Sequence, residues 1–163
     1  MAKKSDSGSR SGDKKRAAGQ PKLAAVPTEH WGEEPEEHDY PAAASYLSLL
    51  CEPTEVRRII SALKAAPIER HQAKDLLRSS RLPLLPHDNA HVASDLHKID
   101  DGEKLSPVLL VRGDFRRGLA LTIADGYHRV CASYHLNENA DIPCHLVDHS
   151  SAAAGTAERP HSP

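Results

Sequence analysis

The stretch LTIADGYHRVCASY, residues 121–134, decides the fold that we expect for this chain. A short apolar run of β-forming residues ends at Ile123, and an amphipathic stretch begins directly after Asp125 and Gly126. This order predicts a strand, a tight glycine turn and a helix. The first turn of a helix has unpaired N–H groups and a partial positive charge, and Arg129 falls in that turn. The stretch therefore predicts a binding site for a phosphate-sized anion.

Each residue of this turn has a predicted role beside a structural alternative. Gly126 would let a phosphate approach the backbone N–H groups, and Arg129 would pair with a phosphate oxygen or form a structural salt bridge to Asp125 or Asp148. Asp125 would cap the helix, or serve as a Mg²⁺ ligand or base. His128 would donate to phosphate or shuttle protons near neutral pH, unless it is simply a surface residue.

The aromatic and hydroxyl side chains around the turn are weaker candidates. Tyr127 and Tyr134 suit packing better than stacking against a base. Thr122 is a strand position whose hydroxyl would reach a ligand only in a favourable orientation. His87 and His91 are four residues apart, but a turn-like sequence separates them and no cysteine or carboxylate lies at metal-site spacing. We therefore expect no metal ion held by side chains alone.

Composition and charge limit the class of protein. With 163 residues, 39% hydrophobic and only 4% aromatic, the chain has room for one domain with a modest aliphatic core. A formal net charge of −2 argues against a general attraction to nucleic acid. Three widely spaced cysteines without a CxxC pair are typical of reduced thiols. We find no apolar run of about 18 residues and no secretory signal, so we expect a cytoplasmic protein without membrane contact.

Both ends of the chain are expected to be disordered. Residues 1–37 contain few large aliphatic side chains, and residues 150–163 are small and polar. The first of these tails has a basic part followed by glutamates, so it could contact nucleic acid or an acidic partner.

Residues 38–80 are expected to form a helical segment. Apolar spacing and the prolines at positions 53 and 67 predict three helices, over residues 42–51, 54–66 and 68–79. Arg57 and Arg58 belong to a basic face that could also meet nucleic acid, or could simply be solvated. The same segment could provide the surface of a homodimer.

Residues 81–149 are expected to form the domain that contains the turn. A short helix is predicted over residues 91–98, and the continuous apolar run after Ser106 predicts a strand buried on both faces. A hairpin connection follows over residues 113–118. The last strand starts at Ile142, where Pro143 indicates an edge or a bulge.

Three pieces of this domain together resemble the ParB/sulfiredoxin superfamily, over about residues 81–148. They are the strand that starts at Pro107, the turn and helix with Gly126, Arg129 and Ala132, and the closing strand that starts with Ile142 and Pro143. The resemblance implies an α+β fold with a small mixed β-sheet and helices of the ParB/sulfiredoxin type, here preceded by the N-terminal three-helix segment.

Members of this superfamily have different activities. ParB proteins bind and hydrolyse cytidine triphosphate with the turn that corresponds to residues 126–129, but a partition protein needs further domains, which we do not expect here. Sulfiredoxins carry a reactive cysteine where this chain has Tyr127, so we expect no sulfinate reduction. The turn ADGYHR, residues 124–129, differs in one residue from the ADGHHR turn of free-serine kinases. Their acidic catalytic residue would correspond, poorly, to Asp88.

These observations lead to one leading expectation and two alternatives. The leading one is a protein that binds a nucleotide or another phosphate ligand, with a nucleoside triphosphate and Mg²⁺ as cofactors and with or without weak hydrolysis. The second is a small-molecule kinase acting on an amino-acid-type hydroxyl compound. The third is a non-enzymatic, DNA-associated regulatory protein. The candidate catalytic residues are His128, Asp88 and Asp125, and the candidate ligand-binding residues are Gly126, Tyr127, His128, Arg129 and Thr122.

Overall fold

The computed structural model describes residues 30–149, which form a mixed α+β domain of five α-helices and a four-stranded sheet. The elements in chain order are α1 (Asp39–Leu47), α2 (Pro53–Ala65), β1 (Ile68–Gln72), α3 (Ala73–Ser80), α4 (Ala90–Asp100), β2 (Val108–Arg112), the 3₁₀ helix η2 (Phe115–Arg117), β3 (Thr122–Asp125), α5 (Tyr127–Leu136) and β4 (Asp141–Asp148). The expected α+β class is confirmed. Within residues 30–149, no helix is both long and apolar enough to cross a bilayer.

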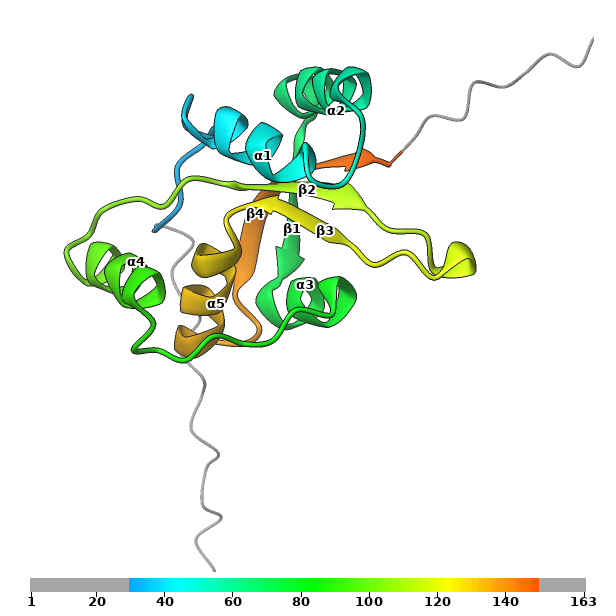
Figure 1. Cartoon of the computed structure of the whole chain (residues 1–163). Coiled ribbons are helices and arrows are strands. Elements are labelled where there is room, and N and C mark those ends of the chain that lie inside the picture. Colours follow the sequence, from blue (N-terminus) through cyan, green and yellow to red (C-terminus); the bar gives the residue numbers. More distant parts are fainter. Residues whose placement is uncertain (1–29, 150–163) are drawn as a thin grey trace, which may run out of the picture.

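The sheet is mixed, with the strand order β1-β4-β2-β3 (Figure 1). β4 pairs antiparallel with β1 and parallel with β2, and β2 pairs antiparallel with β3. Helices α1 and α2 cover one face of the sheet, while α3, α4 and α5 lie on the other side (Figure 1). The chain therefore builds three layers, with the sheet in the middle.

Strand β2 is the centre of both hydrophobic cores. Val108 and Leu110 belong to the core beneath α3, α4 and α5, whereas Leu109 and Val111 belong to the core beneath α1 and α2. All four side chains are buried. Because successive residues of a strand point to opposite faces, a strand covered on both sides must be apolar throughout. This confirms the buried strand expected from the sequence.

Helix α2 also follows its sequence pattern. It starts with Pro53 at its first position, as proline favours, and buries Val56, Ile59 and Leu63 against the sheet. The predicted helix over residues 54–66 is thus confirmed in place and in orientation.

The third helix of the N-terminal segment was predicted wrongly in its first part. Residues Ile68–Gln72 form β1, which pairs with β4 from Ile68 opposite His145 to Gln72 opposite Asp141, and α3 begins only at Ala73. Pairing with the edge of β4 satisfies backbone groups of both strands, and this tertiary contact overrides the helical pattern of the sequence. Because β1 belongs to the sheet, residues 38–80 and 81–149 share one structural unit.

The place of β4 also differs from the expectation. Pro143 suggested an edge strand or a bulge, yet β4 lies between β1 and β2. Parallel pairing with β2 begins only at Cys144, so Pro143 precedes that ladder. A proline is tolerated there because no N–H is needed on that side.

Part of the predicted N-terminal tail is ordered against the domain. The indole of Trp31 is buried in the core beneath α3, α4 and α5, and Gly32 donates a backbone hydrogen bond of 2.8 Å to the carbonyl of Leu105. The prediction of disorder was therefore wrong for residues 30–37, because one large aromatic side chain offsets their polar composition. The rest of the predicted tails, residues 1–29 and 150–163, lies outside the described residues.

Candidate functional site

The turn between β3 and α5 has the predicted strand, glycine and helix. Gly126 precedes the helix with φ 96° and ψ 17°, and its carbonyl accepts the first helical hydrogen bond, 3.0 Å from the N–H of Val130. No side chain caps this helix, so the predicted N-cap role of Asp125 is wrong. The carboxylate instead turns toward Arg129, one helical turn further on. The N–H groups of the first turn of α5 are therefore left without a side-chain acceptor.

Gly126 is required by the fold itself. A Cβ at this position would lie 2.5 Å from Cγ1 of Val108 and 3.3 Å from Nε of Arg129, and the positive φ disfavours any other residue. The glycine lets the turn pass directly over β2, which brings the start of α5 against the sheet.

Arg129 is the hub of a buried ion-pair network. Its Nη1 donates to the carbonyls of Ser106 at 2.6 Å and Pro107 at 3.3 Å, and its Nη2 donates to Asp125 and, at 3.1 Å, to Asp39. The Arg129 side chain is only 12% exposed. The structural alternative, a salt bridge to Asp125, is thus the arrangement that the structure contains.

Asp39, at the start of α1, is a site residue that sequence reasoning missed. It accepts hydrogen bonds from the hydroxyl of Ser106 and, at 2.9 Å, from the backbone N–H of Glu36. Burial alone would raise the pKa of Asp39, but Ser106, Arg129 and the Glu36 N–H together outweigh it and lower that pKa. No local pattern marks this residue, because its partner Arg129 is 90 positions away in the chain.

The pKa of Asp125 is shifted in the opposite direction to that of Asp39. Burial raises its pKa to about 6; Arg129 opposes the shift, while the negative charge of Asp39 adds to it. Two carboxylates around one guanidinium leave one negative charge uncompensated, so the proton is retained by the one with fewer hydrogen bonds. Asp125 is therefore a carboxyl group that can take up or release a proton near neutral pH.

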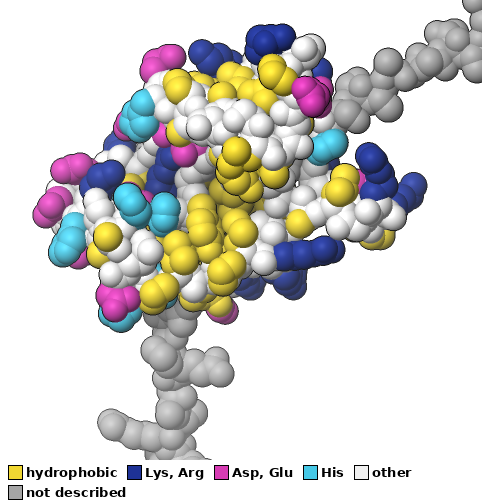
Figure 2. All heavy atoms as spheres, in the orientation of Figure 1, with side chains coloured by type: hydrophobic (Ala, Val, Ile, Leu, Met, Phe, Trp, Pro, Cys, Tyr) yellow, Lys and Arg dark blue, Asp and Glu magenta, His cyan; other side chains and the backbone are white. Residues whose placement is uncertain are grey.

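The turn opens into a small pocket of about 160 Å³ between α4 and α5. Asp125, Gly126, His128 and Arg129 line it from the turn, and α4 contributes His91, Ser94, Asp95 and Lys98. Figure 2 shows histidine, basic and acidic side chains gathered on this part of the surface, beside α4. The structure thus combines four predicted site residues with four that only the packing of α4 against α5 reveals.

Cationic and imidazole groups surround the pocket. The rings of His91 and His128 lie 4.7 Å apart, and Lys98 Nζ lies 3.5 Å from Asp95. Burial, together with the neighbouring imidazole of His91, lowers the pKa of His128, so its neutral form is favoured near pH 7. A neutral imidazole donates a hydrogen bond from one nitrogen and accepts one at the other, as a proton shuttle requires.

Three predicted site residues lie outside this pocket. The hydroxyl of Tyr127 donates to the carbonyl of Pro83, and its ring packs on the core, which confirms the packing role. Thr122 pairs with Val111 at the far end of β3. Asp88 is exposed in the turn before α4 and does not line the pocket.

The described residues contain no cluster of three or more histidine, cysteine or acidic side chains that could hold a metal ion. The three cysteines are free, and burial raises the pKa of Cys131 and brings that of Cys144 to about 12. Both thiols are therefore protonated and unreactive at neutral pH. The site's chemistry is that of hydrogen-bond donors, one lysine, imidazoles and carboxylates.

Comparison with known proteins adds no relative. No protein-family model, no curated protein and no solved structure matches this chain. We therefore infer the function of this chain from the geometry of the pocket and from the motifs of the sequence.

Proposed function

We propose that this chain binds a phosphate-bearing small molecule, a nucleotide, in the pocket between α4 and the start of α5. The observation that carries the proposal is the convergence of three kinds of donor. Uncapped N–H groups of α5, the ammonium group of Lys98 and the imidazoles of His91 and His128 meet in one depression. Helix N-termini and lysine are both common binding groups for phosphate in proteins.

The size of the pocket supports binding of the phosphate end of the ligand. About 160 Å³ is well below the range of roughly 300–1,000 Å³ that holds a whole drug-sized ligand. A nucleotide would therefore insert one phosphate group, while its sugar and base lie over the outer surface of α4 and α5.

The proposed role of Arg129 changes accordingly. Both of its terminal nitrogens already donate to protein oxygens, so it holds the turn in place instead of gripping the ligand. Lys98 takes over as the cation nearest to the incoming phosphate. Lys98 is 47% exposed and its contact with Asp95 is a long one of 3.5 Å, so the lysine can turn toward a ligand at low cost.

Magnesium fits this proposal only as a companion of the phosphate. Asp95 and Asp125 line the pocket, and Mg²⁺ is commonly held by one or two carboxylates together with substrate phosphates. These two residues would hold the ion, which would neutralise phosphate charge. The motif resemblance to ParB-type proteins, which bind nucleotides with the corresponding turn, supports the same assignment and a fold of that type.

A second candidate, phosphoryl transfer to a small hydroxyl compound, is favoured by Asp125. A carboxyl group with a pKa of about 6 beside a phosphate pocket is suited to accept a proton from an attacking hydroxyl. Asp88 is exposed and outside the pocket, so it does not serve this role in our proposal.

The prediction of nucleic-acid binding gains no such support, because Arg58 and Arg78 each pair with a carboxylate on their own helix.

Calorimetric titration tests the binding proposal. Each common nucleoside triphosphate and inorganic tripolyphosphate are titrated into the protein with and without Mg²⁺. We expect binding that Lys98→Ala weakens about tenfold, the loss of one charge-assisted hydrogen bond. Lys104→Ala is the matched control, since Lys104 is exposed and lies outside this pocket. Absence of binding by every probe, or equal binding by both lysine variants, would refute the proposal.

The transfer reaction needs a separate measurement. The protein is incubated with a nucleoside triphosphate that binds and with serine or a related hydroxyl compound, and the nucleoside diphosphate and the phosphorylated product are quantified. We expect Asp125→Asn to abolish turnover, while nucleotide affinity measured without Mg²⁺ changes little. Binding without any product in the unsubstituted protein would restrict the function to ligand binding.

A further inference from the structure

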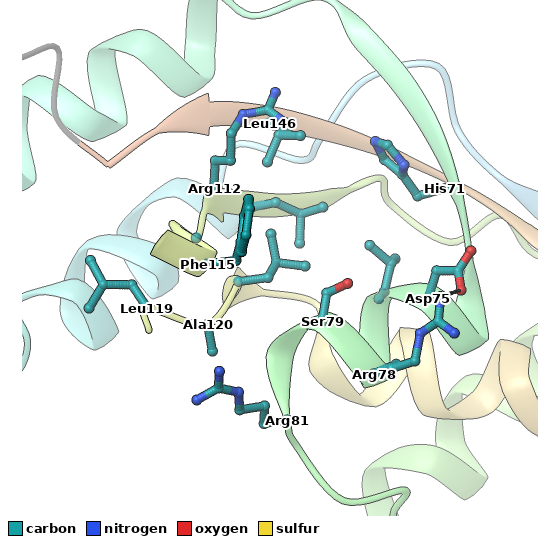
Figure 3. A pocket seen from close by; sticks show the side chains of 14 residues that line it. His71, Asp75, Arg78, Ser79, Arg81, Arg112, Phe115, Leu119, Ala120 and Leu146 are labelled. Atoms are coloured by element: carbon teal, nitrogen blue, oxygen red, sulfur yellow. Dashed lines mark hydrogen bonds and ion pairs between the residues drawn. The ribbon is translucent and has the colours of Figure 1, made fainter. Parts of the chain in front are cut away.

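A second pocket, far larger than the first, lies at the other end of β3. It has a volume of about 530 Å³. Residues of α3, of the C-terminal half of β2 and of the hairpin around η2 line it (Figure 3). Its floor is apolar and continues the core layer beneath α3: Leu76 and Leu110 are buried, and Leu121 and Leu146 are partly buried. This volume lies within the range of roughly 300–1,000 Å³ typical of small-molecule sites.

Arginine side chains surround this apolar floor. Figure 3 shows Arg81 on one side, Arg78 beside Asp75 on α3, and Arg112 near Phe115. Arg78 bonds to Asp75 at 2.9 Å, and Arg112 bonds to Asp148 at 2.9 Å, so both charges are compensated.

Arg81 has no carboxylate partner among residues 30–149. Its only hydrogen bond there is a long one of 3.4 Å, from Nη1 to the carbonyl of Gly118. The pocket thus contains one uncompensated positive charge. A ligand with one negative charge would neutralise the charge of Arg81, whereas a multiply charged ligand would leave negative charge without a partner.

The backbone at Arg81 supports a role beyond folding. Among the described residues, Arg81 is the one non-glycine residue with a positive φ, at 59°, where it ends α3 in the left-handed region. Glycine is the usual residue at this position because a side chain there is strained. Retaining an arginine at a glycine position directs a guanidinium to the pocket at the expense of stability, as is common at functional sites.

Phe115 completes the apolar part of the site. It is 89% exposed, although burial of a phenyl ring is strongly favourable. It lies on η2 and lines the pocket, so a ligand on the leucine floor would cover part of its surface.

We propose that this pocket binds an amphipathic monoanion, an apolar body with one carboxylate, with Arg81 as the carboxylate-binding group. The apolar body lies on the leucine floor against Phe115, and the guanidinium of Arg81 pairs with both carboxylate oxygens, the geometry that arginine favours. This site is distinct from the phosphate pocket, because Leu121 and Asp125 are four residue steps apart along an extended backbone, a distance of roughly 13 Å.

Calorimetric titration with octanoate tests this proposal. Octanol supplies the apolar body without the charge, and acetate supplies the charge alone. We expect saturable binding of octanoate and at least about tenfold weaker binding of each control compound. Octanol binding as tightly as octanoate, or no octanoate binding at all, would overturn the proposal.

The decisive variant is Arg81→Gly. It removes the guanidinium and relieves the strained backbone, so octanoate affinity should fall at least about tenfold while the melting temperature stays equal or rises. Arg116→Ala is the matched control, because Arg116 is an exposed arginine of the same hairpin that does not line the pocket. Phe115→Ala should weaken octanoate several-fold without affecting folding, since its ring is exposed. Equal affinity in all three variants, or competition between octanoate and tripolyphosphate, would contradict a separate carboxylate site.

Discussion

Replacing Asp125 by asparagine should flatten the pH dependence of stability. Burial, opposed by Arg129 and assisted by Asp39, raises the pKa of Asp125 from 3.8 to about 6. The folded protein therefore holds this proton more tightly than the unfolded chain does. The resulting stabilisation of the folded protein is complete at a pH below the pKa of the unfolded chain. It is lost as the pH rises through the pKa of the folded protein.

The magnitude follows from the size of this shift. About two pKa units correspond to a total of about 3 kcal/mol, and roughly half of it falls between pH 5 and pH 8. Asparagine has the shape of the protonated carboxyl group and does not titrate. Arg129 keeps Asp39 as its counterion in this variant, so no buried charge is left unpaired. We compare the free energy of unfolding of Asp125→Asn with that of the unsubstituted protein. The difference, variant minus unsubstituted protein, should be about 1.5 kcal/mol more positive at pH 8 than at pH 5.

Urea unfolding at several pH values measures this difference. Trp31 is the single tryptophan of the chain and is buried, so its fluorescence reports unfolding. Histidine titration is common to both proteins and cancels in the comparison. Asp148→Asn is measured in parallel as the control for removing an exposed carboxylate. A difference for Asp125→Asn that does not vary with pH would refute the assignment of a raised pKa to Asp125.

Two further substitutions, each with a control, test the packing of the Gly126 turn and of the core beneath α2. Gly126→Ala should lower the free energy of unfolding by about 2–4 kcal/mol, because its methyl group would meet Val108 at 2.5 Å in a left-handed backbone. Gly102→Ala, at a positive φ with open space around it, should cost only about 1 kcal/mol, and equal losses would contradict the contact argument. Leu63→Ala should cost about 2–5 kcal/mol in the same urea assay, whereas Leu49→Ala, at a side chain that is 80% exposed, should change stability by less than about 0.5 kcal/mol. A small loss for Leu63 would show that the core beneath α2 is loosely packed.

Local sequence signals predicted the centre of the fold. The apolar run of β2 and the strand, glycine and helix around Gly126 were recognisable because each pattern is complete within about fifteen contiguous residues. β1 was not recognisable, since four of its five residues, Glu69 to Gln72, are polar or charged and it is a strand only through its pairing with β4. Its secondary structure is set by the tertiary environment.

The site was predicted only in part for the same reason. The turn residues are contiguous, so their convergence was foreseen, whereas Lys98 and Asp39 reach the turn from other helices. The predicted cap at Asp125 was wrong because the positive φ of Gly126 places the glycine, and not the aspartate, at the helix boundary. The left-handed backbone conformation of Gly126 cannot be recognised from a pattern of residue types.

The pairing of Asp39 with Arg129 also orders events during synthesis of the chain. Asp39 leaves the ribosome 90 residues before its partner. At about 5–20 residues per second, α1 waits roughly 5–18 s for the arginine that neutralises its buried carboxylate. Docking of α1 onto the sheet is therefore a late step, and the turn at Gly126 acquires its final shape only when this early helix meets α5, one of the last elements to be synthesised.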